Sequence, residues 1–495
     1  MVVSLPGVEV GSIIEYRVTS IHRGEPFFSA AEYFSDHNPL ASKTVRVELA
    51  RNLDLKINNT DPFAIRRRTS HKDGHVVHEW ISENRDMVKK EDRLPPEWIL
   101  KPAVLLSAGS TSGYAALVEK TLIEAADKDK AATVKARELT KGMKTRLQKI
   151  TALRDFVDRA IREAGPNFSA LPLSAVTPAD QVLTESYGNT TDRAVLLYAL
   201  LAEAGLKPRF ILSSSLPRAE GFGMPVVNVL QRNFFDTVLV AVTGDDKKTV
   251  YLGDSGQYAQ PGTLAHSRQP AINLKSGKLE IPQAAFSDAV ETALTLKLSE
   301  TGDAELTKKE SFSGTEFETF HKAFAQFTPE ERQREHQSLL SRISQSAEAS
   351  GELKTVFTHP GELEFSARLP AYAVRDGNRI YLNLPEGLGN LLNLKASRRE
   401  NPFYIEKPIA RTFFYEITLP ENWGPVLLPE TFRVELPAGA GLVDVKVSAE
   451  SGKIFILQQA QLNAAIIPPG DYDKLLELNN RLTGPSAKAI LLQKK

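Results

Sequence analysis

The sequence predicts a multidomain α+β protein with an N-terminal antiparallel β-sandwich, a central domain of helices packed on a sheet, and a β-rich C-terminal region. Three observations predict this class. The chain has 495 residues, which exceeds the size of one ordinary hydrophobic core. Hydrophobic residues alternate with a period of two near both ends, whereas the middle follows a helical period. The hydrophobic and charged fractions, 42% and 25%, are typical of a globular protein.

Strand-like alternation predicts the N-terminal sandwich over residues 1–112. It is clearest at Ile14–Val18 and Val45–Leu49, where apolar and polar side chains take turns. Lys72, Asp73 and Gly74 lie between two further strand-like runs, and Asp-Gly is a common pair in tight β-turns. We therefore expect a hairpin at this position.

Helical periodicity begins at about Tyr114 and opens a central domain predicted over residues 113–285. In ALRDFVDRAIREAG, apolar side chains recur on one helix face, and the run SYGNTTDRAVLLYALLAEAGL predicts a second, more buried helix. The strand-like runs KPRFIL, FFDTVLVAV and KKTVYLG follow. A tight turn joins the last two runs, so we expect them to form an antiparallel hairpin.

The rest of the chain predicts two more β-rich segments. Residues 286–397 start with alternation at Leu294, Leu296 and Leu298, and two helical stretches, EFETFHKAFAQF and PEERQREHQSLLSRISQSAE, interrupt the strands. Residues 398–495 contain the strand-like runs RTFFYEITLP, TFRVELPAG and GKIFILQQAQL. We expect this last segment to be a β module.

Composition excludes several classes of function. Basic and acidic residues balance at 61 each, so nothing favours a nucleic-acid partner. No apolar run is long enough to span a bilayer, and the N-terminus lacks the pattern of a signal peptide. The chain contains no cysteine, which rules out a thiol nucleophile and thiolate metal ligands. The one local histidine cluster, His71, His75 and His78, has unsuitable spacing on a strand, so we expect neither a metal nor a cofactor.

The central segment resembles a transglutaminase-like domain, which has the papain-type arrangement of cysteine proteases. The resemblance rests on YGNTTDRAVLLYALLAEAGLKPRFIL, then FFDTVLVAV, then VYLGDSGQYAQPGTLAH. SLPGVEVGSIIEYRV and HEWISENRDMVKKEDRLPPEW resemble the DUF3857 type of β-sandwich. ITLPENWGPVLLPETFRVELP resembles the DUF3858 type of β module. The resemblance implies a bacterial protein of the periplasm or cell surface, whose first strands and any export signal lie outside this chain.

Carried onto this sequence, the resemblance puts other residues at the catalytic positions. Thr190 stands where the family has its cysteine, and Thr237 stands where it has its histidine. The aspartate position falls on Gly253 or Asp254, depending on the register. A threonine hydroxyl does not ionise near neutral pH and needs an adjacent base, which Thr237 cannot be. We therefore expect no catalytic residue here and interpret the polar start of the helix, Asn189–Asp192, as a cap.

Three functions follow from this interpretation. The favoured one is a catalytically inactive, extracytoplasmic binding or assembly module for an unidentified peptide, glycan or protein. The ligand-lining residues would be Asn189, Thr191, Asp236 and Ser255. The alternative is a peptidase- or amidase-like hydrolase or acyl-transferase that uses non-cysteine residues of the same cleft, with Ser255 and His266 as a conceivable pair. The third is a structural element whose partner completes a site.

Overall fold

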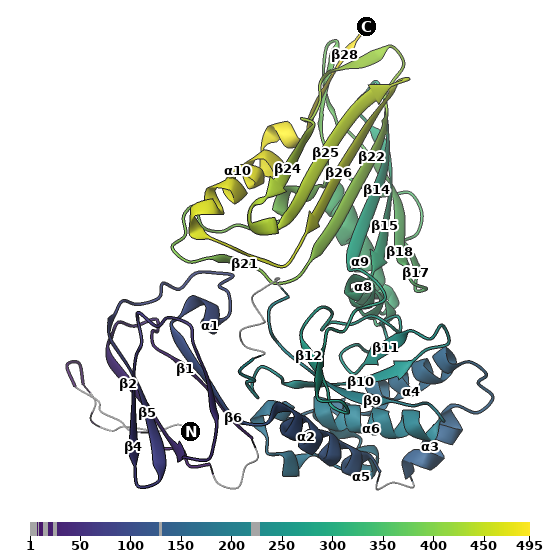
Figure 1. Ribbon diagram of the computed structural model, residues 1–495. Coiled ribbons are helices and arrows are strands. Elements are labelled where there is room, and N and C mark those ends of the chain that lie inside the picture. The colour runs from purple at the N-terminus through teal and green to yellow at the C-terminus, as the bar shows by residue number, and fades with distance from the viewer. Residues whose placement is uncertain (1–6, 8, 13–17, 23–26, 128–130, 219–227) are drawn as a thin grey trace.

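The computed structural model describes residues 7, 9–12, 18–22, 27–127, 131–218 and 228–495, and it has three parts (Figure 1). An N-terminal β-sandwich and a central α+β domain lie side by side, and a C-terminal region built on a large sheet extends away from both. The predicted multidomain α+β class is confirmed. Of the predicted alternation at Ile14–Val18, residues 14–17 lie outside the described residues.

The N-terminal part is a sandwich of two antiparallel sheets. One has the strand order β1 (Phe27–Tyr33), β6 (Ala103–Gly109), β3 (Leu55–Asn59), and the other has the order β2 (Leu40–Ala50), β5 (His75–Arg85), β4 (Arg66–Lys72). Trp80 and Phe34 fill the space between them, and the short helix α1 (Glu97–Leu100) precedes β6. The predicted hairpin is confirmed, because Asp73 and Gly74 adopt φ angles of 48° and 79° between β4 and β5.

The central domain packs helices on one face of a five-stranded antiparallel sheet, ordered β11-β10-β9-β12-β13. The strands are β9 (Arg209–Ser213), β10 (Thr237–Thr243), β11 (Thr249–Leu252), β12 (Ala271–Asn273) and β13 (Lys278–Glu280), with the short pair β7 (Arg162–Glu163) and β8 (Tyr187–Gly188). The helices are α2 (Thr111–Ala126), α3 (Ala131–Leu139), α4 (Arg146–Ala160), α5 (Ala179–Glu185) and α6 (Thr190–Glu203). The predicted hairpin of β10 and β11 is confirmed.

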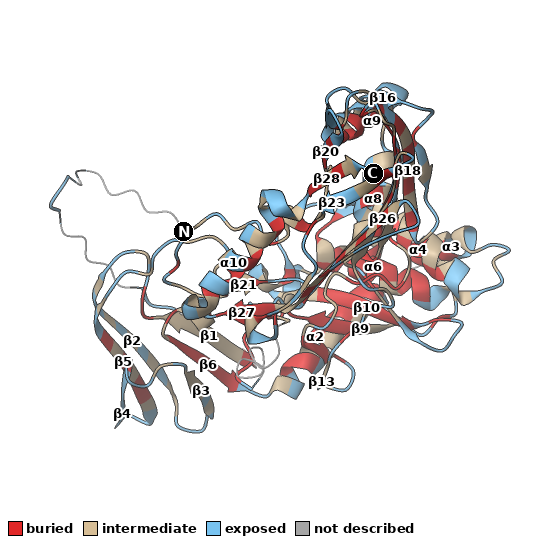
Figure 2. Cartoon of the chain, turned by 90° about the horizontal axis from the view of Figure 1, so that it is seen from above, coloured by how far each residue is buried: buried red, intermediate tan, exposed pale blue. Residues whose placement is uncertain are grey.

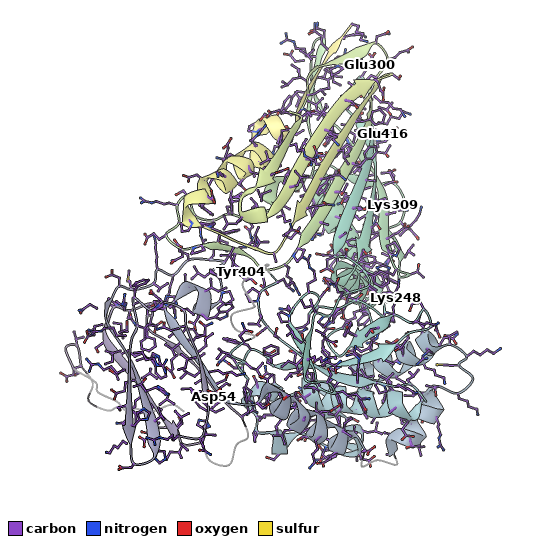
Figure 3. The ribbon with its side chains drawn as sticks, in the orientation of Figure 1. Asp54, Lys248, Glu300, Lys309, Tyr404 and Glu416 are labelled. Carbon is purple, nitrogen blue, oxygen red and sulfur yellow. The ribbon has the colours of Figure 1, made fainter. Side chains whose placement is uncertain are left out.

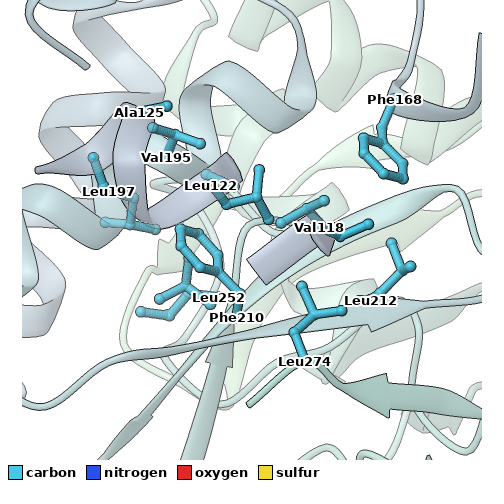
Figure 4. Packing of buried hydrophobic residues seen from close by; sticks show 14 of the residues in the cluster. Val118, Leu122, Ala125, Phe168, Val195, Leu197, Phe210, Leu212, Leu252 and Leu274 are labelled. Atoms are coloured by element: carbon cyan, nitrogen blue, oxygen red, sulfur yellow. The ribbon is translucent and has the colours of Figure 1, made fainter. Parts of the chain in front are cut away.

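Helix α6 lies at the centre of this domain. Its apolar side chains face the other helices and the sheet, and Leu196, Leu197, Leu200 and Leu201 are all buried, as the sequence predicts. Figure 4 shows how side chains of α2 and α6, such as Leu122 and Val195, pack with Phe210 and Leu212 of β9. A helix buried on nearly every side fixes the position of its own N-terminus, where the candidate site lies.

Nine strands of the described chain form the sheet of the C-terminal region. Its order is β16-β18-β15-β14-β22-β26-β25-β24, with β17 paired to β18. The strands are β14 (Ala289–Leu298), β15 (Ala304–Ser313), β16 (Glu348–Ala349), β17 (Lys354–Val356), β18 (Gly361–Leu369), β22 (Ile409–Thr418), β24 (Phe432–Leu436), β25 (Gly441–Glu450) and β26 (Lys453–Leu462). The predicted alternation in β14 is confirmed, since Leu294, Leu296 and Leu298 are buried.

Helices and a smaller sheet pack against the large one. The helices are α8 (Thr315–Ala325), α9 (Pro329–Ile343) and α10 (Tyr472–Thr483). The smaller sheet has the order β19 (Val374–Asp376), β20 (Arg379–Asn383), β28 (Ala489–Lys494), β23 (Trp423–Leu427), and a two-stranded ladder joins β21 (Phe403–Ile405) to β27 (Ala465–Ile467). Figure 2 shows that buried residues concentrate in the central domain and along this large sheet.

Two features of the C-terminal region differ from the expectation. β14 pairs in parallel with β22, so one sheet continues across the predicted border between residues 397 and 398. Parallel pairing over such a long separation leaves no local signal in the sequence. Helix α10 lies in a segment expected to be only strands, although its buried positions follow the spacing of an amphipathic helix: Tyr472, Leu475, Leu478 and Leu482.

The N-terminal sandwich joins the C-terminal region through the segment that contains Tyr404, which Figure 3 labels at this junction. The Tyr404 amide donates to the Arg93 carbonyl (2.8 Å). Arg399, fully buried, binds the Asp92 carboxylate (2.9 Å) and lies 3.8 Å from Glu91. Among the helices described, none combines the length and apolar character needed to cross a bilayer.

Candidate functional site

The N-terminus of α6 is closed by a reciprocal cap. Asn189 Oδ1 accepts from the Asp192 amide (3.0 Å), and Asp192 Oδ2 accepts from the Asn189 amide (3.1 Å). Asp192 Oδ1 also accepts from the Thr177 amide (2.9 Å), so this buried carboxylate has all its oxygens occupied. A Cβ at Gly188 would lie 2.8 Å from the Asp192 Cβ, which explains the glycine before the cap. The cap that the sequence predicts is thus made by Asn189 and Asp192.

The two threonines of this turn take no part in the cap bonds. Thr190 is the first residue of α6 and is partly exposed, as expected for the position of a nucleophile at a helix start. Thr191 is buried, and its hydroxyl has no hydrogen-bond partner among the residues that the structure describes. Thr190, the position predicted for the family's cysteine, thus begins α6 and has no base beside it in the described contacts.

Thr237 opens β10 and is paired across the sheet with Ser213. Its hydroxyl donates to Asp236 Oδ1 (3.0 Å). Burial raises the pKa of the Asp236 carboxyl, while the Thr237 hydrogen bond and the nearby His266 oppose that shift. At the position predicted for the family's histidine, the Thr237 hydroxyl is thus engaged with the side chain of its own neighbour.

The two candidates for the aspartate position, Gly253 and Asp254, lie directly after the end of β11. Leu252 pairs with Val240, and Gly253 lies against the backbone of Val238 and Leu239 with a φ of 111°. Continuation of this register places Asp254 level with Val238, one residue from Thr237. The Asp254 carboxylate is buried, so it is the acidic group that this strand brings to the site.

The Asp254 carboxylate binds the imidazole of His266, a contact that the sequence did not predict. Asp254 Oδ2 accepts from His266 Nδ1 (3.0 Å) and from the His266 amide (2.9 Å). A carboxylate only accepts hydrogen bonds, so Nδ1 carries the hydrogen and Nε2 is the free nitrogen of the neutral ring. The other oxygen, Oδ1, is buried without a partner among the described residues. Sequence reasoning considered His266 only with Ser255, but the Ser255 hydroxyl donates to the Thr263 carbonyl (3.3 Å).

Side chains from two other helices hold the loop that follows Asp254. The Gly256 amide donates to Glu318 of α8 (2.7 Å), and the Gln257 amide donates to Asp158 of α4 (2.8 Å). Burial raises the pKa of Glu318, and the negative charges of Asp254 and Asp158 raise it further. Asp158 also pairs with Arg193 in the first turn of α6 (2.9 Å). These contacts connect the start of α6 to the loop after Asp254.

The structure therefore brings Thr237, Asp236 and Asp254 together at adjacent strand ends, with Ser255 directly after them. Thr190 lies at the start of the helix that packs on β10. The close approach of Thr190 to Thr237 stays a prediction. The three predicted histidines of the N-terminal hairpin separate as expected: His71 and His75 are exposed, whereas His78 is buried and contacts Arg67 and Thr69.

Comparisons with known proteins agree with this architecture. Residues 1–88 match a domain of unknown function, DUF3857, and residues 378–492 match a second one, DUF3858. No match was found among curated proteins.

Two solved structures are similar to the chain. A crystal structure from Parabacteroides distasonis, described as a putative protease, matches with a TM-score of 0.59 at 16% identity, over 94% of this chain and 75% of that one. A structure from Cytophaga hutchinsonii, described as a putative cysteine protease, covers 46% of this chain and 78% of its own at 11% identity, but its TM-score of 0.21 is too low to establish a shared fold. Residues 1–88 and 378–492 thus match the DUF3857 and DUF3858 families, and the central α+β domain between them is consistent with a transglutaminase-like fold in a chain that has no cysteine.

Proposed function

We propose that this protein is catalytically inactive and acts as an extracytoplasmic binding or assembly module for a peptide, glycan or protein. The observation that carries the proposal is the chemistry at the two replaced positions. The whole chain lacks cysteine, and Thr237 supplies a hydroxyl where a base is needed. Location outside the cytoplasm is inferred from the resemblance and is compatible with a chain that has no thiol to oxidise.

The retained scaffold supports a binding role. The helix cap, the central apolar core and the loop after Asp254 are connected by contacts between elements, while the buried Thr191 hydroxyl and Asp254 Oδ1 have no partner among the described residues. The half-buried side chains of Asp236 and His266 and the buried Asp254 carboxylate provide hydrogen-bonding capacity that a bound ligand could use.

One observation favours the second candidate, a hydrolase or acyl-transferase of the same cleft. Asp254 orients His266 as the acid of a hydrolytic triad orients its base, so a general base is available if a hydroxyl reaches Nε2. Both hydroxyls next to this pair, those of Thr237 and Ser255, donate elsewhere in the structure. Either hydroxyl would have to break its present hydrogen bond before it could donate to His266 Nε2 and act as a nucleophile.

Covalent labelling with a fluorophosphonate probe separates the two candidates. The probe reacts with hydroxyls that an adjacent base activates. We expect the wild-type protein to label no faster than the variant His266→Asn. Labelling that is faster in the wild type, and that maps by mass spectrometry to a serine or threonine near His266, would reject the inactive assignment and support the hydrolase.

A further inference from the structure

The C-terminal region contains a cavity of about 510 Å³ that lies well away from the central domain's strand ends. It is bounded by the large sheet, by the loop from Leu384 to Gly389, and by the end of α10 with the segment up to Lys488. Figure 1 shows α10 lying along β24 and β25 at this part of the sheet. The volume falls in the range of small-ligand sites, roughly 300–1,000 Å³.

One row of directly paired residues forms the floor of the cavity. Phe413 of β22 pairs with Gln458 of β26, Gln458 pairs with Val445 of β25, and Val445 pairs with Phe432 of β24. All four side chains line the cavity. The floor therefore presents an aromatic ring at each end with an amide and a small apolar group between them.

Gln458 breaks the apolar pattern of its strand at this point. Its neighbours on the same face of β26 are Ile454 and Ile456 in one hydrophobic core and Ala460 and Leu462 in another. A polar side chain between two cores costs free energy unless its hydrogen bonds are made. The cavity opens at the position where the sheet carries this amide.

One hydrogen bond holds the side-chain amide of Gln458 in a single orientation, and it satisfies the amide oxygen only. Its side chain is 5% exposed, and Oε1 accepts from the Leu388 amide (3.1 Å). Because Oε1 must face that N–H group, Nε2 points the other way. Nε2 has no hydrogen-bond partner among the described residues. A donor without a protein partner, on a largely buried side chain at the floor of a cavity, indicates a ligand with an acceptor oxygen.

The side chains that line the cavity carry equal numbers of negative and positive charges. Its ionisable side chains are two acids, Glu386 and Glu430, and two bases, Arg481 and Lys488. Glu386 binds the buried Lys308 (2.7 Å), and Arg481 binds Glu430 (2.7 Å) while stacking over Phe432. A phosphate or other strongly anionic ligand would compete with these internal pairs. The balance favours a neutral ligand with both donors and acceptors.

We propose that this cavity binds a short neutral saccharide. Sugar rings have apolar C–H faces that pack against aromatic rings, here Phe413 and Phe432. Their hydroxyls both donate and accept, which matches the Gln458 Nε2 donor and the Glu386 carboxylate. The site lies outside the central domain, so the inference goes beyond the proposed function and stands whether or not that domain has activity.

Binding of neutral oligosaccharides to the full chain tests this proposal. The probes are di- to tetrasaccharides of glucose, galactose, mannose and N-acetylglucosamine, measured by saturation-transfer NMR and then by titration calorimetry. We expect at least one probe to bind, and Phe432→Ala and Gln458→Leu to weaken it about tenfold or more. Phe414→Ala is the matched control, because Phe414 is next to Phe413 but lies on the other face of the sheet and is 40% exposed.

A steric variant keeps the test decisive if Gln458→Leu fails to fold. Ser486 is exposed at the rim of the cavity, so Ser486→Trp should block entry while the melting temperature stays unchanged. No binding by any neutral probe would overturn the proposal. So would tighter binding of inorganic phosphate, of a sialylated sugar or of a short peptide, or saccharide binding that Phe432→Ala and Ser486→Trp leave intact.

Discussion

At the scale of single residues, the start of α6 contains two residues that cap the helix and one that the resemblance places at the catalytic cysteine position. The Asp192 carboxylate accepts two backbone hydrogen bonds, from the amides of Asn189 and Thr177, and the Asp192 amide donates to Asn189 Oδ1, whereas Thr190 has no side-chain bond in the described contacts. The polar run NTTD therefore contains one pair of cap residues, Asn189 and Asp192, and one vacant nucleophile position.

We expect Asp192→Ala to lower the free energy of unfolding by about 1–3 kcal/mol, because buried amides of Asn189 and Thr177 lose their acceptor. Thr190→Ala should change it by less than about 0.5 kcal/mol, as usual for a partly exposed side chain. Thermal unfolding of both variants checks this. Equal losses in the two variants would show that Thr190 is part of the cap.

Titration of Asp236 should make the stability of the folded protein depend on pH in a direction that follows from its raised pKa. Burial raises the pKa of Asp236, so the folded protein holds this proton more tightly than the unfolded chain does. The contribution of this group to stability is therefore present at low pH and is lost as the pH rises through the raised pKa. The variant Asp236→Asn keeps the acceptor for Thr237 and removes the titration.

We expect the melting temperature of Asp236→Asn, relative to wild type, to rise with pH across that window and then to level off. Asp245→Asn is the control of opposite sign, because the amides of Leu147 and Arg146 hold the pKa of Asp245 below its ordinary value. Its relative melting temperature should fall as the pH rises. A difference for Asp236→Asn that does not vary with pH would contradict the buried placement of this carboxyl.

At the scale of elements, α6 is the helix on which the central domain depends. Leu200 is fully buried between neighbouring helices and the sheet. Leu200→Ala should lower the free energy of unfolding by about 2–5 kcal/mol through the cavity it leaves. Leu147→Ala, on an exposed position of α4, is the matched control. An unchanged melting temperature for Leu200→Ala would place α6 at the edge of the domain and reject its assignment.

Much of the fold could be predicted from local pattern. The hairpin at Asp73-Gly74, the pair β10–β11 and the burial of α6 follow from turn residues and periodicity that short segments carry themselves. The parallel pairing of β14 with β22 could not be predicted, because it depends on contacts between distant segments. At the site, the Asp254–His266 pair was missed for the same reason, since the two groups bond directly although they are twelve positions apart in the sequence.

At the scale of the whole molecule, Arg399 ties the N-terminal sandwich to the C-terminal region. Its guanidinium is fully buried, binds Asp92 and lies near the rings of Phe403 and Tyr472. Burial alone would raise the pKa of Glu91, but hydrogen bonds from the amides of Glu400 and Asn401 lower it below its ordinary value. At this junction, the charged side chains thus bind one another and the backbone amides of Glu400 and Asn401.

Arg399→Ala should loosen this junction, because it leaves the buried Glu91 and the half-buried Asp92 carboxylates without their cation, with a loss below the about 3–5 kcal/mol of a fully buried pair. We expect faster hydrogen exchange in residues 86–93 and 400–405, with the central domain unaffected. Arg398→Ala is the matched control, since Arg398 is exposed beside Arg399. Equal exchange in the two variants would show that the junction does not depend on Arg399.

The central claim is that a transglutaminase-like scaffold persists here without its chemistry, and turnover by the purified full chain tests it most directly. Wild type and Thr190→Ala are to be compared on generic peptide, amide and amine cross-linking substrates. The account predicts no turnover above the blank for either protein, because the chain has no thiol and Thr237 is not a base. Turnover that survives repurification of the wild type and disappears in Thr190→Ala would contradict it.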